Sequence, residues 1–508
     1  MFSALTLDRR RFVQATGLTA VTGLVAGSQA SAADEAEEEQ TQESDQEQQA
    51  GQSQQTQQGP PVDAGDVFDH LDQAAISVFA RDIETGDVIA DSGSERPVQP
   101  ASTTKLLTTA AAFDELGPDY RYETTVGVVG DRRNQRVVES LGVVASGDPD
   151  LTASDLEALA AAVADAGIER VTDRLVVDVS AFDDGEYPPG WTLGDAVNTY
   201  GSKSSAFVVN HNEAEVTVSR QGDDCEFEHT VEPDSGLVDV EIELECVDSD
   251  RFVTITTPNH WTNTAEVNGR MVPDDEATAS VPVATPNEHA ARVFARALAD
   301  EGVEITPGGG GPEPEIEISD EPIEFTEEVT THESVPLSDI AEGLNHWSYN
   351  MVAENIARTV AYEREGTGNG SWSVWESYLD ETLAAAGAET PQIRDGSGLS
   401  RHDLASARDA VSMIEWALDA DWGEEFYGTM AVAGEDGTLR NRLGDVDATI
   451  RAKTGSLRGV TCLAGVIEDD GEPATSFAVL AANLTGERAN GASPRVDELV
   501  TAIAEESG

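Results

Sequence analysis

A hydroxyl and an amine stand three residues apart in the run Ser102-Thr103-Thr104-Lys105. Residues at this spacing share one face of a helix, so the Lys105 amine can reach the Ser102 hydroxyl. A lysine that burial keeps neutral can take the hydroxyl proton and make the oxygen a nucleophile. At the start of a helix, unpaired backbone N–H groups can also stabilise an oxyanion. The spacing indicates a serine acyl-transfer hydrolase, although the same spacing is common by chance.

Lysine is almost absent from the 508 residues. Only three of the 30 basic residues are lysine, namely Lys105, Lys203 and Lys453, and the others are arginine. Arginine stays protonated, whereas a desolvated lysine can lose its proton, so such a chain should keep lysine where arginine cannot replace it. This favours chemical roles for Lys105 and Lys453. Lys203 lies outside the motifs, and we expect it at the surface rather than at the substrate.

Two further segments combine residue types that suit catalysis. Ser348-Tyr349-Asn350 interrupts a helix predicted over residues 338–363, so that a hydroxyl and an amide can point into one cleft. By itself this segment is more typical of an ordinary helix cap. Lys453-Thr454-Gly455 ends a predicted strand, where the lysine and the threonine hydroxyl suit a substrate carboxylate and Gly455 permits close approach of the ligand. The alternative is a plain hairpin end.

The elements that carry these motifs come from both ends of the chain. Residues 75–90 predict a hairpin, and a helix should follow Pro100 and end at Gly117. Residues 448–453, 460–468 and 476–484 predict three strands, and residues 493–506 a final helix. The two ends could share one sheet, with an insertion of short alternating strands between them.

The three motifs, in this order, are the signature of serine penicillin-recognising enzymes, here with Tyr349 in place of the usual aspartate. The chain resembles the D-alanyl-D-alanine carboxypeptidase/endopeptidases of the class C penicillin-binding proteins. The resemblance extends from about residue 62 to the C-terminus. It is carried by residues 100–112, 395–400, 437–442 and 451–456, and by the large insertion that separates Ser348 from Ser102.

The resemblance implies an α/β (α+β) penicillin-binding/β-lactamase-like transpeptidase fold, in which helices flank an antiparallel sheet. Residues 62–124 and 323–508 would form the catalytic domain, and residues 125–322 a β-rich inserted part. The implied substrates are cell-wall-type peptides that end in D-amino acids, and the implied inhibitors are β-lactams. No cofactor and no metal are implied.

The resemblance also implies a role for each motif residue. Ser102 would attack the carbonyl, Lys105 would accept the proton, and Ser348 would protonate the leaving amine. Asn350 would hold the substrate amide, and the substrate would further contact Lys453, Thr454, Gly455 and Ser456. The backbone N–H groups of Ser102 and Ser456 would form the oxyanion hole. The loop Asp395-Gly396-Ser397-Gly398 should lie near the cleft, where a structural turn is at least as plausible as a catalytic role.

Other functions stay open at this point. A β-lactamase or a D-amino-acid esterase would carry the same motifs, and a non-catalytic cell-surface protein could keep the fold for binding. The sequence contains neither the H-E-x-x-H pattern of metallohydrolases nor the G-x-S-x-G pattern of α/β-hydrolases.

The formal net charge is -67, with 97 acidic residues. Such a chain repels itself at low salt, so we expect a strongly saline, halophilic setting. Nucleic acid and anionic membrane surfaces are poor partners for this charge. Two cysteines, Cys225 and Cys246, could form a disulfide outside the cell or remain free thiols, and Cys462 should be buried.

The N-terminus predicts export. Arg9-Arg10-Arg11-Phe12 and Ala30-Ser31-Ala32 frame a short apolar run, as in a twin-arginine signal peptide that would be cleaved after residue 32. Residues 33–61 are rich in Gln and acidic residues and predict a disordered tether. We therefore expect an extracellular or cell-surface protein that inserts into no membrane once the signal is removed.

Overall fold

The structure is a computed structural model that describes residues 62, 74–183, 185, 187–222, 224–306, 314–366, 368, 370–389, 391–484 and 492–507. The predicted signal peptide and tether, residues 1–61, lie outside the described residues. All elements below belong to one compact unit, Gln58–Gly508.

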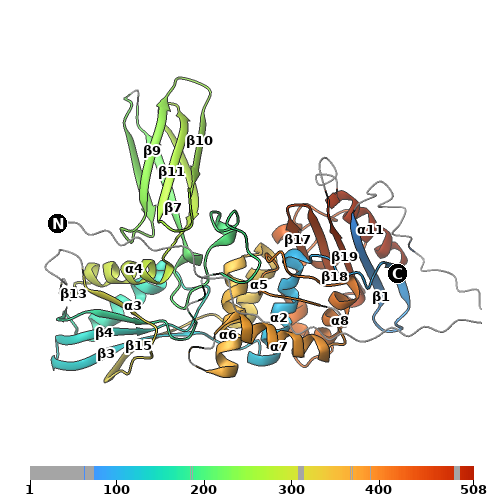
Figure 1. Cartoon of the computed structure of the whole chain (residues 1–508), viewed down its shortest axis with the longest axis horizontal. Coiled ribbons are helices and arrows are strands. Elements are labelled where there is room, and N and C mark those ends of the chain that lie inside the picture. The colour runs from blue at the N-terminus through green and yellow to red at the C-terminus, as the bar shows by residue number, and fades with distance from the viewer. Residues whose placement is uncertain are drawn as a thin grey trace, which may run out of the picture. The chain divides into compact units, whose positions relative to one another are not determined.

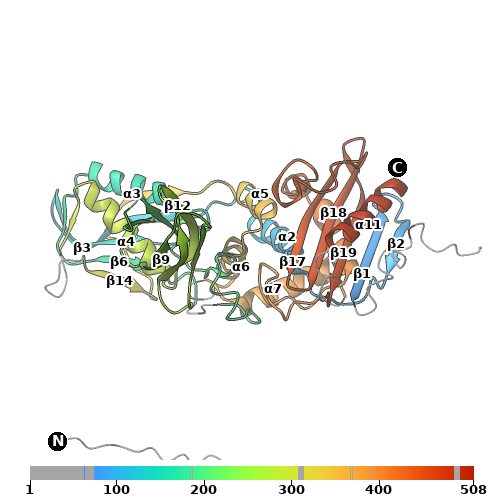
Figure 2. The same ribbon diagram turned by 90° about the horizontal axis from the view of Figure 1, so that it is seen from above.

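The two ends of the chain meet in one six-stranded sheet of order β16-β17-β18-β19-β1-β2, which confirms the prediction (Figures 1 and 2). All neighbouring strands are antiparallel, and Ala75 of β1 pairs with Ala482 of β19. The strands are β1 (Ala75–Asp82), β2 (Val88–Ser92), β16 (Ala431–Val432), β17 (Ile450–Leu457), β18 (Val460–Asp469) and β19 (Glu472–Ala482).

Helices cover both faces of this sheet because the apolar residues of β1 alternate between the faces. Phe79 packs into the core formed with α2, α6 and α8, whereas Val78 and Ala80 pack towards α11. Figure 2 shows α11 lying across its face of the sheet. The helices are α2 (Thr104–Leu116), α5 (Leu337–Trp347), α6 (Asn350–Glu365), α7 (Trp372–Ala385), α8 (Ala407–Leu418), α9 (Gly423–Gly428) and α11 (Ala492–Glu506), with the short η1 (Ala101–Thr103) and η4 (Gly437–Leu439).

The inserted part contains a seven-stranded sheet packed against two helices, α3 (Ala153–Asp165) and α4 (Pro286–Asp300). The order is β13-β5-β4-β3-β15, with β6 and β14 joined beside β4. Its strands are β3 (Glu123–Asn134), β4 (Val137–Val144), β5 (Arg170–Val171), β6 (Leu175–Asp178), β13 (Glu304–Ile305), β14 (Ile316–Ser319) and β15 (Glu327–Glu333).

Two three-stranded sheets form a second layer pair within the insertion, drawn in green in Figure 1. Their strands are β7 (Glu213–Arg220), β8 (Phe227–Glu232), β9 (Asp239–Cys246), β10 (Phe252–Thr256), β11 (Thr264–Met271) and β12 (Asp275–Pro282). A disulfide joins Cys225 to Cys246, and Cys462 is a buried free thiol, so both cysteine expectations are confirmed. Two short turns of the insertion, η2 (Thr199–Gly201) and η3 (Asn210–Asn212), contact helix α6 of the other part of the chain.

The structure departs from the sequence predictions at two places. Strand β15 lies beyond residue 322 yet pairs with β3, so we propose that the inserted part runs from Glu123 to Glu333. Lys203 was expected at the surface, but its side chain is buried and its amine donates to the Ala284 carbonyl at 2.9 Å. Its long methylene stem can be buried when a carbonyl accepts from the amine.

Within the described ranges, none of the helices combines the length and the apolar character that a membrane crossing requires.

Candidate active site

Ser102 lies in η1, at the turn that leads into α2. The residue before it, Ala101, has a φ of +50°, a conformation that costs energy for a residue with a side chain. The loop that contains Gly398 presses against this turn, since a Cβ atom on Gly398 would lie 1.9 Å from the Ala101 carbonyl oxygen. Only glycine fits there, and Gly398 also has a positive φ of +78°. The position of Ser102 is therefore held by tight backbone packing.

Lys105 is fully buried and its amine touches three acceptors. Its Nζ lies 3.0 Å from Ser102 Oγ, 2.6 Å from Asn350 Oδ1 and 2.8 Å from the Ser397 carbonyl oxygen. Burial lowers the pKa of Lys105 from 10.5 to about 7, while the nearby carboxylates of Asp395 and Glu354 oppose this shift. The amine can therefore gain or lose a proton near neutral pH while it contacts the Ser102 hydroxyl.

The segment Ser348-Tyr349-Asn350 forms the break between α5 and α6, as predicted. Ser348 has a left-handed conformation, with a φ of +68°, which ends α5 and lets α6 begin at Asn350. The Asn350 amide connects two parts of the molecule: its oxygen accepts from Lys105 and its nitrogen donates to the Tyr200 carbonyl at 2.7 Å. In the described part of the chain, no hydrogen bond joins the Ser348 hydroxyl to Ser102 or Lys105.

Strand β17 brings Lys453 to the opposite side of η1. A Cβ atom on Gly455 would lie 2.8 Å from the Pro100 carbonyl oxygen, so the strand edge packs directly on the turn that carries Ser102. Lys453 is fully buried; burial and then repulsion from Lys105 hold its pKa well below the ordinary value. Next to it, Thr454 Oγ1 donates to Thr438 Oγ1 at 2.7 Å, whereas Ser456 is exposed.

A buried carboxylate that was not predicted from the sequence, Glu354, holds the loop that contacts Lys105. Glu354 lies one turn after Asn350 on α6 and is fully buried. It accepts from the backbone N–H groups of Gly396 and Ser397 at 3.1 and 2.9 Å, and from the Trp372 indole at 2.7 Å. Burial and the charge of Asp395 raise its pKa, while these donors lower it. Glu354 thus holds the loop whose Ser397 carbonyl accepts from Lys105.

The loop Asp395-Gly396-Ser397-Gly398 is both a structural turn and part of the site. Asp395 accepts from the backbone N–H groups of Gly398 and Ser400, each at 2.7 Å, and from the Trp191 indole at 2.8 Å. These bonds orient the Ser397 carbonyl towards the Lys105 amine. The loop is therefore a structural turn that also contacts the Lys105 amine.

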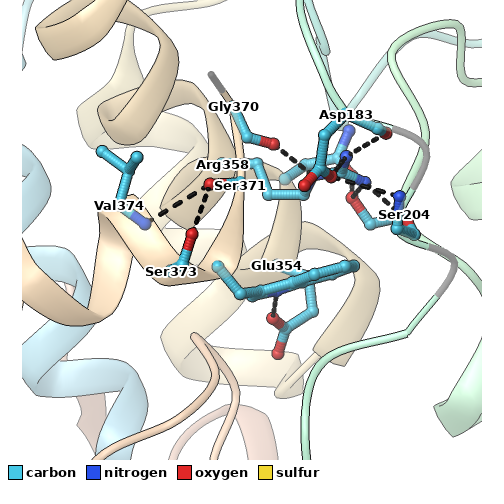
Figure 3. Close-up of polar contacts among 11 residues, drawn as sticks. Asp183, Ser204, Glu354, Arg358, Gly370, Ser371, Ser373 and Val374 are labelled. Carbon is cyan, nitrogen blue, oxygen red and sulfur yellow. Dashed lines mark hydrogen bonds and ion pairs between the residues drawn. The ribbon is translucent and has the colours of Figure 1, made fainter. Parts of the chain in front are cut away.

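Arg358 connects the same helix to the inserted part. Its guanidinium is buried between the rings of Phe182 and Trp372, at 4.4 and 4.5 Å from their centroids. It donates to the Asp183 carboxylate and to the Gly370 carbonyl, at 2.7 and 2.8 Å (Figure 3). Burial lowers its pKa to about 10, so it remains a cation at neutral pH.

The predicted site residues thus come together to different degrees. Hydrogen bonds join Lys105 to both Ser102 and Asn350. Lys453 lies near enough for the charge of Lys105 to lower its pKa. Ser348 lies two residues before Asn350, at the break between α5 and α6. A neutral lysine amine in contact with a serine hydroxyl can activate that hydroxyl for nucleophilic attack on a carbonyl carbon. A second lysine nearby suits a substrate that also carries an anionic group.

Comparisons with known proteins agree with this geometry. The sequence model of the D-Ala-D-Ala carboxypeptidase 3 (S13) family matches residues 63–503. A D-alanyl-D-alanine carboxypeptidase of an Actinomadura species is 30% identical over 429 residues, which cover 80% of this chain and 78% of the relative. The D-alanyl-D-alanine carboxypeptidase DacB of Haemophilus influenzae is 26% identical over 400 residues, or 77% of this chain and 81% of DacB.

A solved structure supports the fold. The crystal structure of penicillin binding protein 4 from Haemophilus influenzae matches with a TM-score of 0.73 and 24% identity, and covers 88% of this chain and 98% of that one. The predicted penicillin-binding fold is therefore confirmed. Since the family model spans residues 63–503, the chain belongs to the D-Ala-D-Ala carboxypeptidase 3 (S13) family.

Proposed function

We propose that this protein is a serine-type D-Ala-D-Ala carboxypeptidase that acts through an acyl-enzyme, is inhibited by penicillins, and also has the capacity for endopeptidase action. The observation that carries the proposal is the buried amine of Lys105, 3.0 Å from the Ser102 hydroxyl and with a pKa of about 7. The amines of Lys203 and Lys453 donate to backbone carbonyls, those of Ala284 and Thr454.

The proposed reaction begins with attack of Ser102 Oγ on the carbonyl carbon between two D-amino acids. Lys105 takes the hydroxyl proton as the Oγ–C bond forms, and the backbone N–H groups of Ser102 and Ser456 stabilise the oxyanion. The C–N bond then breaks, and the proton held by Lys105 passes through the Ser348 hydroxyl to the leaving amine, so that Lys105 is neutral again. Water finally cleaves the ester and regenerates the Ser102 hydroxyl.

The second lysine supports the same step by its charge. Burial and then the charge of Lys105 lower the pKa of Lys453, so the two buried amines resist being protonated together. A substrate carboxylate beside Lys453 and Thr454 would favour a proton on Lys453 and so leave Lys105 neutral. Binding of the correct substrate would then prepare the base.

The proposal includes the cellular setting. The twin-arginine pattern and the A-x-A site support export, and the -67 charge supports a saline exterior. Peptides of a cell wall that end in D-amino acids are then the substrates that the enzyme would meet.

The test is acylation of the purified, salt-folded protein by a fluorescent penicillin, beside a Ser102→Ala variant. Mass spectrometry should find one penicilloyl group on Ser102, and peptides that end in D-Ala-D-Ala should release D-alanine. Rapid release of hydrolysed penicillin without D-alanine release would instead favour a β-lactamase. A protein that is neither labelled nor active would favour the non-catalytic alternative.

A further inference from the structure

A pocket of about 240 Å³ lies beside the segment Ser348-Tyr349-Asn350. Its walls come from both parts of the chain: Trp347 and Tyr349 from the break between α5 and α6, and Tyr200, His211 and Glu213 from the insertion. Pockets at such junctions are common ligand sites. Ser348 and Asn350 also line it, so the pocket adjoins the segment whose Asn350 contacts Lys105.

Three aromatic rings of this pocket face solvent. Trp347 is 53% exposed, Tyr200 49% and Tyr349 41%, and they are three of the nine exposed large apolar or aromatic side chains in the described residues. Exposed rings that gather at one place indicate a binding surface, whereas single ones need no explanation. Tyr349 stands where the motif usually has aspartate, so it adds a ring to this surface.

The ring of His211 holds Tyr349 in place. Their centroids are 4.4 Å apart, and the planes are tilted by 38°. His211 sits in η3, where Asn210, His211 and Asn212 have φ values of +48°, +58° and +59°. Three consecutive residues in this region are costly, and such strain tends to occur at functional sites. The buried Asn212 amide fixes the turn by donating to the Lys203 carbonyl at 2.7 Å.

The polar groups of the pocket restrict the ligand. Glu213 is half-buried, and burial raises its pKa to about 7, so near neutral pH it can donate or accept a hydrogen bond. A purely apolar ligand would leave this carboxyl group without a partner, which is unfavourable. A ring that presents C–H faces to the aromatic side chains and hydroxyls to Glu213 satisfies both kinds of wall.

We propose that this pocket is a subsite for a single sugar ring joined to the peptide substrate, so that the enzyme prefers glycopeptides to free peptides. The inference rests on the proposed function, because it places the ring on the molecule that acylates Ser102. The volume of about 240 Å³ suits one ring rather than a chain of them. Tyr349 and Trp347 supply the flat faces, and His211 orients Tyr349.

The test compares kcat/KM for a peptide that ends in D-Ala-D-Ala with kcat/KM for the same peptide carrying an N-acetylated amino sugar at its N-terminus. The sugar should raise kcat/KM by about tenfold in the parent protein. Trp347→Ala and Tyr349→Ala should each reduce this preference by roughly three- to tenfold, the effect of one aromatic contact. Tyr349→Phe, which keeps the ring, should retain most of it. The ratio cancels any general loss of activity.

Trp261→Ala is the matched control, since Trp261 is 68% exposed and lies outside the pocket. It should leave the preference unchanged. Equal rates on the two substrates, or a preference that survives both alanine variants, would overturn the inference. So would a preference that moves to peptides carrying a phenyl or an ammonium group instead of the sugar.

Two readouts separate this inference from the proposed function. If D-alanine is released equally from both substrates, the function stands and the sugar subsite fails. If neither substrate reacts and Ser102 is not labelled, the function fails; the subsite is then judged by titrating the full chain with the free amino sugar and following tryptophan fluorescence. A saturable change that is lost in Trp347→Ala but not in Trp261→Ala supports the subsite, and no change refutes it.

Discussion

The rate of acylation should follow the titration of Lys105, because only the neutral amine can accept the Ser102 proton. Burial lowers its pKa from 10.5 to about 7. At a pKa of 10.5, roughly one amine in three thousand would be neutral at pH 7, whereas at a pKa of about 7 roughly half are neutral. Burial thus increases the reactive fraction by on the order of a thousandfold.

The direction of the pH dependence follows from the same value. Since protonation removes the base, acylation should slow as the pH falls through about 7. We expect a rate about tenfold below the plateau at pH 6 and about a hundredfold below it at pH 5. Above about pH 8 the rate should be constant until another group titrates.

The assay is the second-order rate constant for labelling of Ser102 by a fluorescent penicillin between pH 5 and 9, at one high ionic strength. Circular dichroism at each pH checks that the protein stays folded. Lys105→Arg should be slow at every pH, because arginine stays protonated. A rate that does not change between pH 5 and 8, or a midpoint above pH 9, would refute the assignment of Lys105 as the base.

Three further outcomes are expected. Asp395→Asn should move the acid limb of acylation to lower pH, because the carboxylate that most strongly raises the pKa of Lys105 is lost; a merely structural role would lower the melting temperature and leave the limb in place. Dialysis from molar salt into dilute buffer should unfold the protein, because the -67 charge is then no longer screened, and circular dichroism would follow this. Replacing both Cys225 and Cys246 by serine should destabilise the insertion by about 3 kcal/mol, given their separation of 21 residues, as measured by denaturant unfolding.

The catalytic motifs could be predicted from the sequence because their spacing is local or their residue type is rare. Ser102 and Lys105 lie within one turn, so helix geometry alone brings them together. Lys453 was singled out because lysine is scarce, and the shared sheet brings it beside η1. The same scarcity applies to Lys203, which is buried and not at the surface as expected.

The supporting residues could not be predicted in the same way. Glu354 is one of 97 acidic residues, and its place on a helix looks like that of any solvated carboxylate. Its role depends on Gly396, Ser397 and Trp372, which approach it only in the folded chain. The pairing of β15 with β3 joins residues about two hundred positions apart and leaves no local pattern. Such contacts are set by tertiary packing, which periodicity does not report.

One face of α6 explains why the insertion belongs to the active site. Asn350, Glu354 and Arg358 are spaced by four residues and therefore lie along a single stripe of the helix. Asn350 joins Lys105 to the Tyr200 carbonyl, Glu354 holds the Ser397 loop, and Arg358 is surrounded by groups of the insertion. The Trp372 indole bonds to Glu354 and stacks on Arg358, so it couples the last two.

Removal of the insertion would therefore do more than shorten the chain. The Arg358 guanidinium would lose the Asp183 carboxylate and the Phe182 ring, and a buried cation without its partners is strongly destabilising. The Asn350 amide would lose the Tyr200 carbonyl, which orients its oxygen towards Lys105. Because Lys105 bonds to Asn350 on this helix and to the Ser397 carbonyl of the loop that Glu354 holds, the base depends on residues that are remote in sequence and contributed by both parts of the chain.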